Sequence, residues 1–146
     1  MFSISISNAR ANWIDINLNV GDELRQFMAS SVLNDPLREL ADLGVFIATR
    51  EPGTLGVRFW LEPGGLELRA VWQPELVLVL YEADEAYPAL DRPRVVVEEV
   101  VEPNAAAREL LRSLLRAEHV LSPQTWGHEF PAERASVLAD AIAASR

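Results

Sequence analysis

Alternation of apolar and polar residues over the first twenty positions limits what this chain can fold into. Apolar side chains occupy every second position in two runs: Phe2, Ile4 and Ile6, then Ile14, Ile16, Leu18 and Val20. Successive side chains of a β-strand point to opposite faces, so this spacing predicts two half-buried strands. Residues 8–10 between the runs suit a hairpin turn. The chain is therefore expected to begin as an antiparallel sheet.

Residues 22–32 fit two structures. Leu24, Phe27 and Met28 have the spacing of a helix, whereas the turn signal at residues 21–22 suits a third strand of the meander. Of these two alternatives, we expect the strand.

A helix start is encoded at residues 34–36, where Asn34 and Asp35 offer capping side chains and Pro36 takes a first-turn position. Apolar residues then follow at helical spacing until the chain reaches Pro52: Leu37, Leu40, Ala41, Gly44, Ile47 and Ala48. Gly44 lowers the stability of a helix by about 1 kcal/mol relative to alanine. We therefore expect this helix to approach a sheet closely at Gly44.

Strand patterns return in the second half of the chain. Residues 57–61 and 66–72 alternate around the turn at residues 63–65, which predicts a hairpin. Residues 76–81 are apolar on both faces, as in a central strand, and residues 94–101 have the β-branched content of another strand. Residues 82–93 between them are expected to form a long surface loop.

Two helices are expected to close the chain. One has an apolar stripe after Asn104 (Ala107, Leu110, Leu111, Leu114 and Leu121), and the other has one after Pro131 (Val137, Leu138, Ala141 and Ile142). Residues 1–146 show no internal repeat or linker. The sequence thus predicts one α+β domain, with a mainly antiparallel sheet and about three helices packed mostly on one of its faces.

Composition excludes several classes of function. The chain has 146 residues, no cysteine, and 13 basic residues that are all arginine. The absence of lysine excludes Schiff-base chemistry and a phosphate-binding P-loop. The net charge of −9 repels nucleic-acid phosphates, so we expect a basic protein rather than DNA or RNA as a partner.

The expected location is the cytoplasm. Residues 1–7 lack the basic and apolar regions of a secretory signal. The longest apolar run, residues 76–81, is far shorter than the roughly 20 residues that cross a bilayer. We therefore expect a soluble protein that does not associate with membranes.

Motifs for catalysis and for cofactor or metal binding are missing from the sequence. It contains neither a dinucleotide fingerprint nor a Gly-x-Ser-x-Gly elbow. His128 and Glu129 match the first two residues of a zinc-protease motif, but Ala132 occupies the position of its second histidine. The other histidine, His119, is expected at a helix C-terminus, and His128 in a loop near Trp126. We expect no catalytic residue, no metal and no cofactor.

Acidic residues gather in one segment. Residues 75–102 hold eight acids against two arginines, which is −6 of the net −9. We predict that these acids form a docking surface for a basic protein: Glu75, Glu82, Asp84, Glu85, Asp91, Glu98, Glu99 and Glu102. The alternative is a solvated loop that supports solubility.

Two tryptophans are possible binding anchors. Trp13 alternates with the isoleucines of its strand, and Trp60 shares a face with Arg58 and Glu62, so both could lie on the polar side of the sheet. The alternative is a sheet face that the closing helices cover. An aromatic interface of this kind would suit a regulatory module or a homo-oligomer.

Several short motifs resemble small bacterial proteins related to the immunity proteins of polymorphic toxin systems. They are residues 13–15 (Trp-x-Asp), Ser30-Ser31 before a helix start, residues 51–53 before a hairpin that ends at Trp72, and residues 126–131 before the final helix. The resemblance implies a non-catalytic inhibitor that binds one cognate toxin, often a basic nuclease. The alternatives are the aromatic interaction module and a small-molecule-binding or enzymatic domain.

Overall fold

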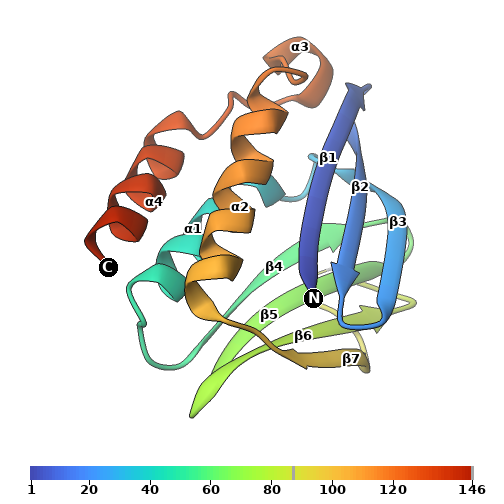
Figure 1. Ribbon diagram of the computed structural model, residues 1–146. Coiled ribbons are helices and arrows are strands. Elements are labelled where there is room, and N and C mark those ends of the chain that lie inside the picture. The colour runs from blue at the N-terminus through green and yellow to red at the C-terminus, as the bar shows by residue number, and fades with distance from the viewer. Residues whose placement is uncertain (87, 146) are drawn as a thin grey trace.

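The computed structural model describes residues 1–86 and 88–145, which form two antiparallel sheets beside a layer of helices (Figure 1). The strands are β1 (Phe2–Arg10), β2 (Trp13–Val20), β3 (Glu23–Ser30), β4 (Thr54–Trp60), β5 (Gly65–Gln73), β6 (Glu75–Ala83) and β7 (Arg94–Val100). The helices are α1 (Pro36–Ala48), α2 (Pro103–Glu118), α3 (Pro123–Trp126) and α4 (Ala132–Ala144). The predicted single α+β domain is confirmed, and the strand expected within residues 22–32 is confirmed as β3.

The strands form two sheets, and the expectation of one sheet was wrong. The first sheet has the order β1-β2-β3 and the second the order β4-β5-β6-β7, each a meander. Helix α1 lies between β3 and β4 in the chain, and the hydrogen-bonded ladder does not continue across it. Alternation predicts strands and their buried faces, but it carries no information on which strands pair.

The two sheets pack against each other and against the helices. Apolar side chains on the inner faces of β2, β5 and β6 are almost completely buried: Ile14, Ile16, Leu18, Val20, Leu66, Leu68, Leu78 and Leu80. Phe27 of β3 meets Phe59 of β4 edge to face, with ring centroids 5.3 Å apart. Arg25 of β3 reaches Glu82 of β6 at 2.7 Å. The core therefore extends from one sheet to the other.

Helix α1 occupies the centre of the helical layer, where it contacts β4, α2 and α4. Asp35 caps it by accepting hydrogen bonds from two backbone N–H groups of its first turn, as expected. Gly44 does not face a sheet, contrary to expectation: a Cβ there would lie 2.6 Å from Leu138 Cδ2 of α4. The close approach that glycine permits is therefore between two helices, because α4 covers the side of α1 opposite the strands.

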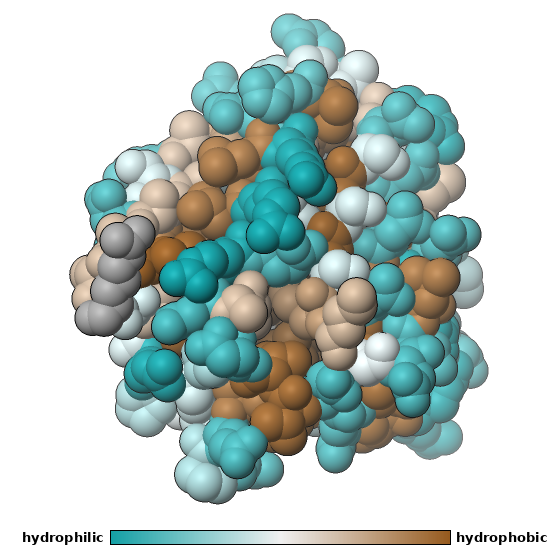
Figure 2. Space-filling model, in the orientation of Figure 1, coloured by the Kyte–Doolittle hydropathy of each residue, from teal (hydrophilic) through white to brown (hydrophobic). Residues whose placement is uncertain are grey.

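Helix α2 covers the outer edge of β1. Glu109 accepts a hydrogen bond from the Ile4 N–H at 3.0 Å, and the Ser113 hydroxyl donates to the Ile4 carbonyl. Edge strands expose unpaired backbone groups that can pair with other chains, and this contact occupies those of Ile4. On the side seen in Figure 2, a band of hydrophilic residues follows the exposed face of α2, with hydrophobic residues on either side.

Some element boundaries differ from those expected. Helix α2 begins at Pro103 with Glu102 as its cap, so Asn104 lies inside it, and α3 is an additional short helix. Glu82 belongs to β6, which shortens the predicted loop to residues 84–93. His119 ends α2 as expected, and His128 Nε2 lies 2.9 Å from the Ser31 carbonyl oxygen.

Candidate functional site

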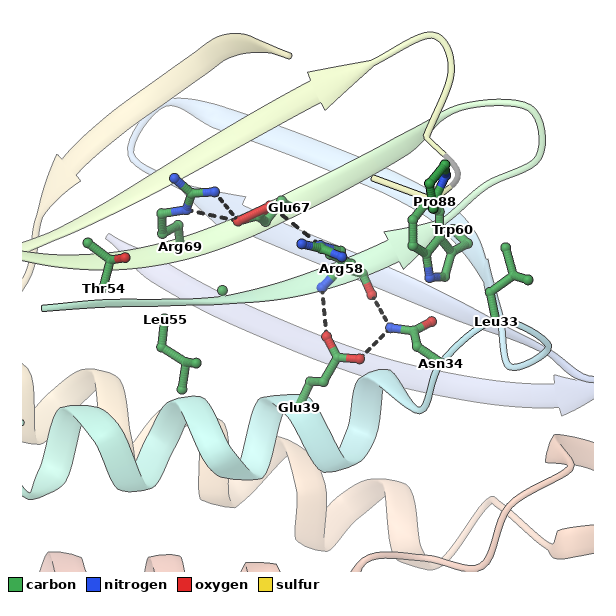
Figure 3. A pocket seen from close by; sticks show the side chains of 11 residues that line it. Leu33, Asn34, Glu39, Thr54, Leu55, Arg58, Trp60, Glu67, Arg69 and Pro88 are labelled. Atoms are coloured by element: carbon green, nitrogen blue, oxygen red, sulfur yellow. Dashed lines mark hydrogen bonds and ion pairs between the residues drawn. The ribbon is translucent and has the colours of Figure 1, made fainter. Parts of the chain in front are cut away.

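An open cleft of about 600 Å³ lies between the start of α1 and the outer face of β4 and β5 (Figure 3). Alternation in β4 and β5 directs Arg58, Glu67 and Arg69 to this face. Trp60 and Pro88 form one end of the cleft. Asn34 and Glu39 approach from the α1 side.

Glu67 is the central charged group of the cleft and is only 6% exposed. Its carboxylate accepts a hydrogen bond from Arg69 Nε at 2.8 Å and forms an ion pair with Arg69 Nη2 at 2.7 Å, and Arg58 Nε lies 3.8 Å away. The carboxylate crosses over Gly56, where a Cβ would lie 2.5 Å from Glu67 Oε2. A larger residue at position 56 would displace this carboxylate, so the glycine of β4 permits the close approach of Glu67.

Glu39 and Asn34 bind the outer edge of β4. Glu39 accepts a hydrogen bond from the Arg58 N–H at 3.1 Å, and Asn34 donates to the Arg58 carbonyl at 2.8 Å and to Glu39 at 2.5 Å. Burial raises the pKa of Glu39, although these hydrogen bonds oppose that shift. These hydrogen bonds occupy backbone groups at the edge of β4. Glu109 and Ser113 occupy those of Ile4 at the edge of β1 in the same way.

The polar groups of the cleft mainly serve the fold. Both carboxylates accept hydrogen bonds within the domain, Glu67 from an arginine and Glu39 from the backbone of β4. The charged side chains of the cleft that are most open to solvent are Arg58 (46% exposed) and Arg69 (39% exposed). Arg69 also lies over the ring of Tyr81 at 4.9 Å. The cleft therefore joins α1 to the four-stranded sheet and presents two guanidinium groups.

Ionised Glu39 is expected to reduce stability at neutral pH. Its pKa is higher in the folded chain than in the unfolded chain, so this cost is present above the folded pKa and is lost as the pH falls below the unfolded value. Urea denaturation of the wild type and Glu39→Gln at about pH 7 and about pH 4.5 measures the effect. Between about pH 7 and about pH 4.5, the free energy of unfolding of the wild type should rise relative to that of the variant. A difference that does not change with pH would contradict this assignment.

Four of the eight predicted acidic site residues have partners within the domain, and three of these four lie outside the β6–β7 loop. Glu82 is ion-paired with Arg25 at 2.7 Å and with Arg94 at 3.0 Å. Glu99 accepts from the N-terminal amine at 2.8 Å, and Glu102 caps α2. Their charge is therefore partly neutralised within the domain.

The β6–β7 loop brings three other acids together. Asp84, Glu85 and Asp91 are exposed, and a bridge pairs Glu85 with Asp91 through the Asp91 N–H and the Glu85 carbonyl, 2.9 Å apart. Only Asp84 has an ion-pair partner among the described residues, Arg94 at 3.4 Å. We name these three residues the acidic loop.

The remaining predicted acids lie apart from one another. Glu75 starts β6, and Glu98 lies on β7 opposite Val79; both are exposed and have no ion-pair partner among residues 1–86 and 88–145. The eight acids thus cover the sheet ends, the loop and a helix start rather than one face.

The two tryptophans predicted as anchors belong to different sheets. Trp60 is 5% exposed and forms a wall of the cleft beside Pro88. Trp13 is half-buried on the three-stranded sheet, where it lines an apolar groove of about 420 Å³ with Phe27, Met28 and Leu61. The two rings therefore do not share a sheet face. We define this second hollow as the Trp13 groove.

Sequence reasoning did not identify Glu39, Glu67 or Arg69 as a cluster. A usable signal was Gly56, since an isolated glycine within an alternating strand indicates close approach by another group. In the hairpin register, Arg58 is directly opposite Glu67. Glu39 had no such signal, because its partner is the backbone of a strand 19 positions away.

Comparison with protein-family models, curated proteins and solved structures gives no match for this chain. In the part of the chain that the structure describes, no three His, Cys, Asp or Glu side chains are grouped to hold a metal ion. None of the described helices is both long and apolar enough to cross a membrane.

Proposed function

We propose that this protein acts by binding rather than by catalysis, as an immunity-like inhibitor that docks its acidic loop on a basic cognate toxin. The observation that supports this proposal is the bridge between Glu85 and Asp91. It places two exposed acidic residues opposite each other along the backbone, and Asp84 directly precedes Glu85 in the chain. Like charges opposite each other in a strand pair are destabilising, and a bound cationic group relieves that repulsion.

The geometry of the loop favours binding in a second way. Pro88 and Pro93 lie within residues 84–93 and fix two backbone φ angles. The bridge joins residues 85 and 91, so Pro88 lies between its two ends and Pro93 follows it. Residues whose backbone is already restrained by proline and by the bridge lose less conformational entropy on binding, so more of the electrostatic attraction contributes to affinity.

Long-range charge supports the same partner. The chain carries −9 overall, and a field of one sign accelerates encounter with a protein of the opposite sign. Arg94 is already engaged by Glu82 and Asp84, so it offsets little of the charge that Glu85 and Asp91 present. A basic toxin is therefore the class of partner that this surface suits.

The test is protection of growing cells. An immunity gene lies beside its toxin gene, so the neighbouring gene product is expressed alone and then together with this chain. We expect the neighbour to arrest growth and the wild-type chain to restore it. A neighbour that is harmless, or a toxin that this chain neither binds nor neutralises, would overturn the proposal.

A further inference from the structure

Strand β3 has a long, regular and uncovered edge. Its backbone hydrogen-bonds to β2 through eight consecutive residue pairs without a bulge, and no other described segment bonds to its backbone. Helices cover the corresponding edges of β1 and β4 at Ile4 and Arg58. The edge strand β7 is instead interrupted by a register shift in its pairing with β6. Bulges protect sheet edges from pairing, and β3 lacks this protection.

The outer face of β3 carries an apolar residue on either side of Gln26. Leu24 is 55% exposed and Met28 is 39% exposed, and both point to the same face as Gln26. Met28 also lines the Trp13 groove at this edge. The two exposed apolar side chains of β3 therefore lie at equal distances along the strand from Gln26, two residues before it and two after it.

This face is neutral, unlike the molecule as a whole. Exposed or half-buried uncharged side chains cover it (Ser3, Ser5, Asn17, Asn19 and Gln26), and Asp15 is paired with Arg10 at 3.3 Å. Two copies of a chain that carries −9 repel each other over most approaches. The repulsion between copies is smallest where charge is absent, so this sheet favours a second copy over the basic partner proposed above.

We propose that two copies of this chain associate by antiparallel pairing of β3 with the partner's β3, with Gln26 on the two-fold axis. This register places Leu24 opposite the partner's Met28 and Met28 opposite the partner's Leu24. Each Leu24 then covers the Trp13 groove of the other copy. The result is a continuous six-stranded sheet in which both uncovered β3 edges are satisfied.

A cysteine cross-link tests the register directly, because the chain contains no cysteine. Directly opposed residues of antiparallel strands have Cα atoms about 4.5–5.5 Å apart, within the range of a disulfide. Gln26→Cys should therefore form a covalent dimer on mild oxidation. Asn17→Cys is the matched control, since it is exposed on the same face but lies one strand further from the axis.

Solution mass tests the association without a cross-link. Light scattering over a concentration series should show the wild type, a chain of 16.2 kDa, approaching twice that mass. Leu24→Asp should raise the dissociation constant at least about tenfold, because it buries a carboxylate at the new contact. At concentrations low enough for both proteins to be monomeric, its unfolding midpoint should stay near that of the wild type, since Leu24 is exposed in the single chain.

Two outcomes would overturn the proposal. A wild type that stays monomeric at every concentration would exclude the dimer. Cross-linking that is equal for Gln26→Cys and Asn17→Cys would exclude the register. Neither result bears on toxin binding by the acidic loop, which is a separate surface.

Discussion

Replacing Gly44 with leucine should lower the free energy of unfolding by about 1–3 kcal/mol. A Cβ at residue 44 would lie only 2.6 Å from Leu138 Cδ2 and 2.8 Å from Leu138 Cδ1. Leu138 is fully buried, so it has little space into which it can move. Helix α1 would have to separate from α4 to admit the larger side chain. Chemical denaturation measures the loss.

Two further variants separate overpacking from helix propensity. In an exposed helix, Gly→Ala stabilises by up to about 1 kcal/mol, whereas Gly44→Ala should destabilise because its Cβ alone contacts Leu138. Combining Gly44→Leu with Leu138→Ala should cost less than the sum of the two single changes. Glu85→Gln, a surface control, should change stability by less than about 0.5 kcal/mol. A stabilised Gly44→Ala would show that α1 and α4 do not pack closely there.

Reversing the acidic loop should weaken binding to the toxin about 100-fold or more. The variant is Asp84→Arg, Glu85→Arg and Asp91→Arg, which places three cations where the proposed partner requires anions. Close interfacial charge pairs have coupling energies of about 1.5–7 kcal/mol, and repulsion adds to their loss. Glu82 is left unchanged because it joins Arg25 and Arg94 between the sheets. Binding kinetics with the inactivated toxin measure the effect.

A matched control separates local charge from net charge. Glu118→Arg, Glu129→Arg and Asp140→Arg make the same change to the net charge at exposed positions outside the sheets. This control should retain nearly the wild-type dissociation rate. Association of the wild type should slow as salt rises to physiological strength, where the Debye length is about 8 Å. Equal losses in both variants, or association that is insensitive to salt, would show that the acidic loop only supports solubility.

Local patterns in the sequence predicted most elements of the fold. Alternation gave β1 and β2 because strand side chains change face at every residue. Asn34, Asp35 and Pro36 marked the start of α1 because capping depends on residues that are adjacent in the chain. The β4–β5 hairpin followed from the turn at residues 63–65. Each of these signals acts over a few residues, so no knowledge of distant neighbours was needed.

The tertiary structure alone decided what these elements contact. It divided the strands into two sheets, placed Leu138 rather than a sheet against Gly44, and put Glu39 on the backbone of Arg58. It also assigned partners to Glu82, Glu99 and Glu102, while Glu85 and Asp91 were left facing each other. Sequence periodicity specifies which face of an element is buried. The partner of that face depends on chain topology, which brings together residues that are far apart in the sequence.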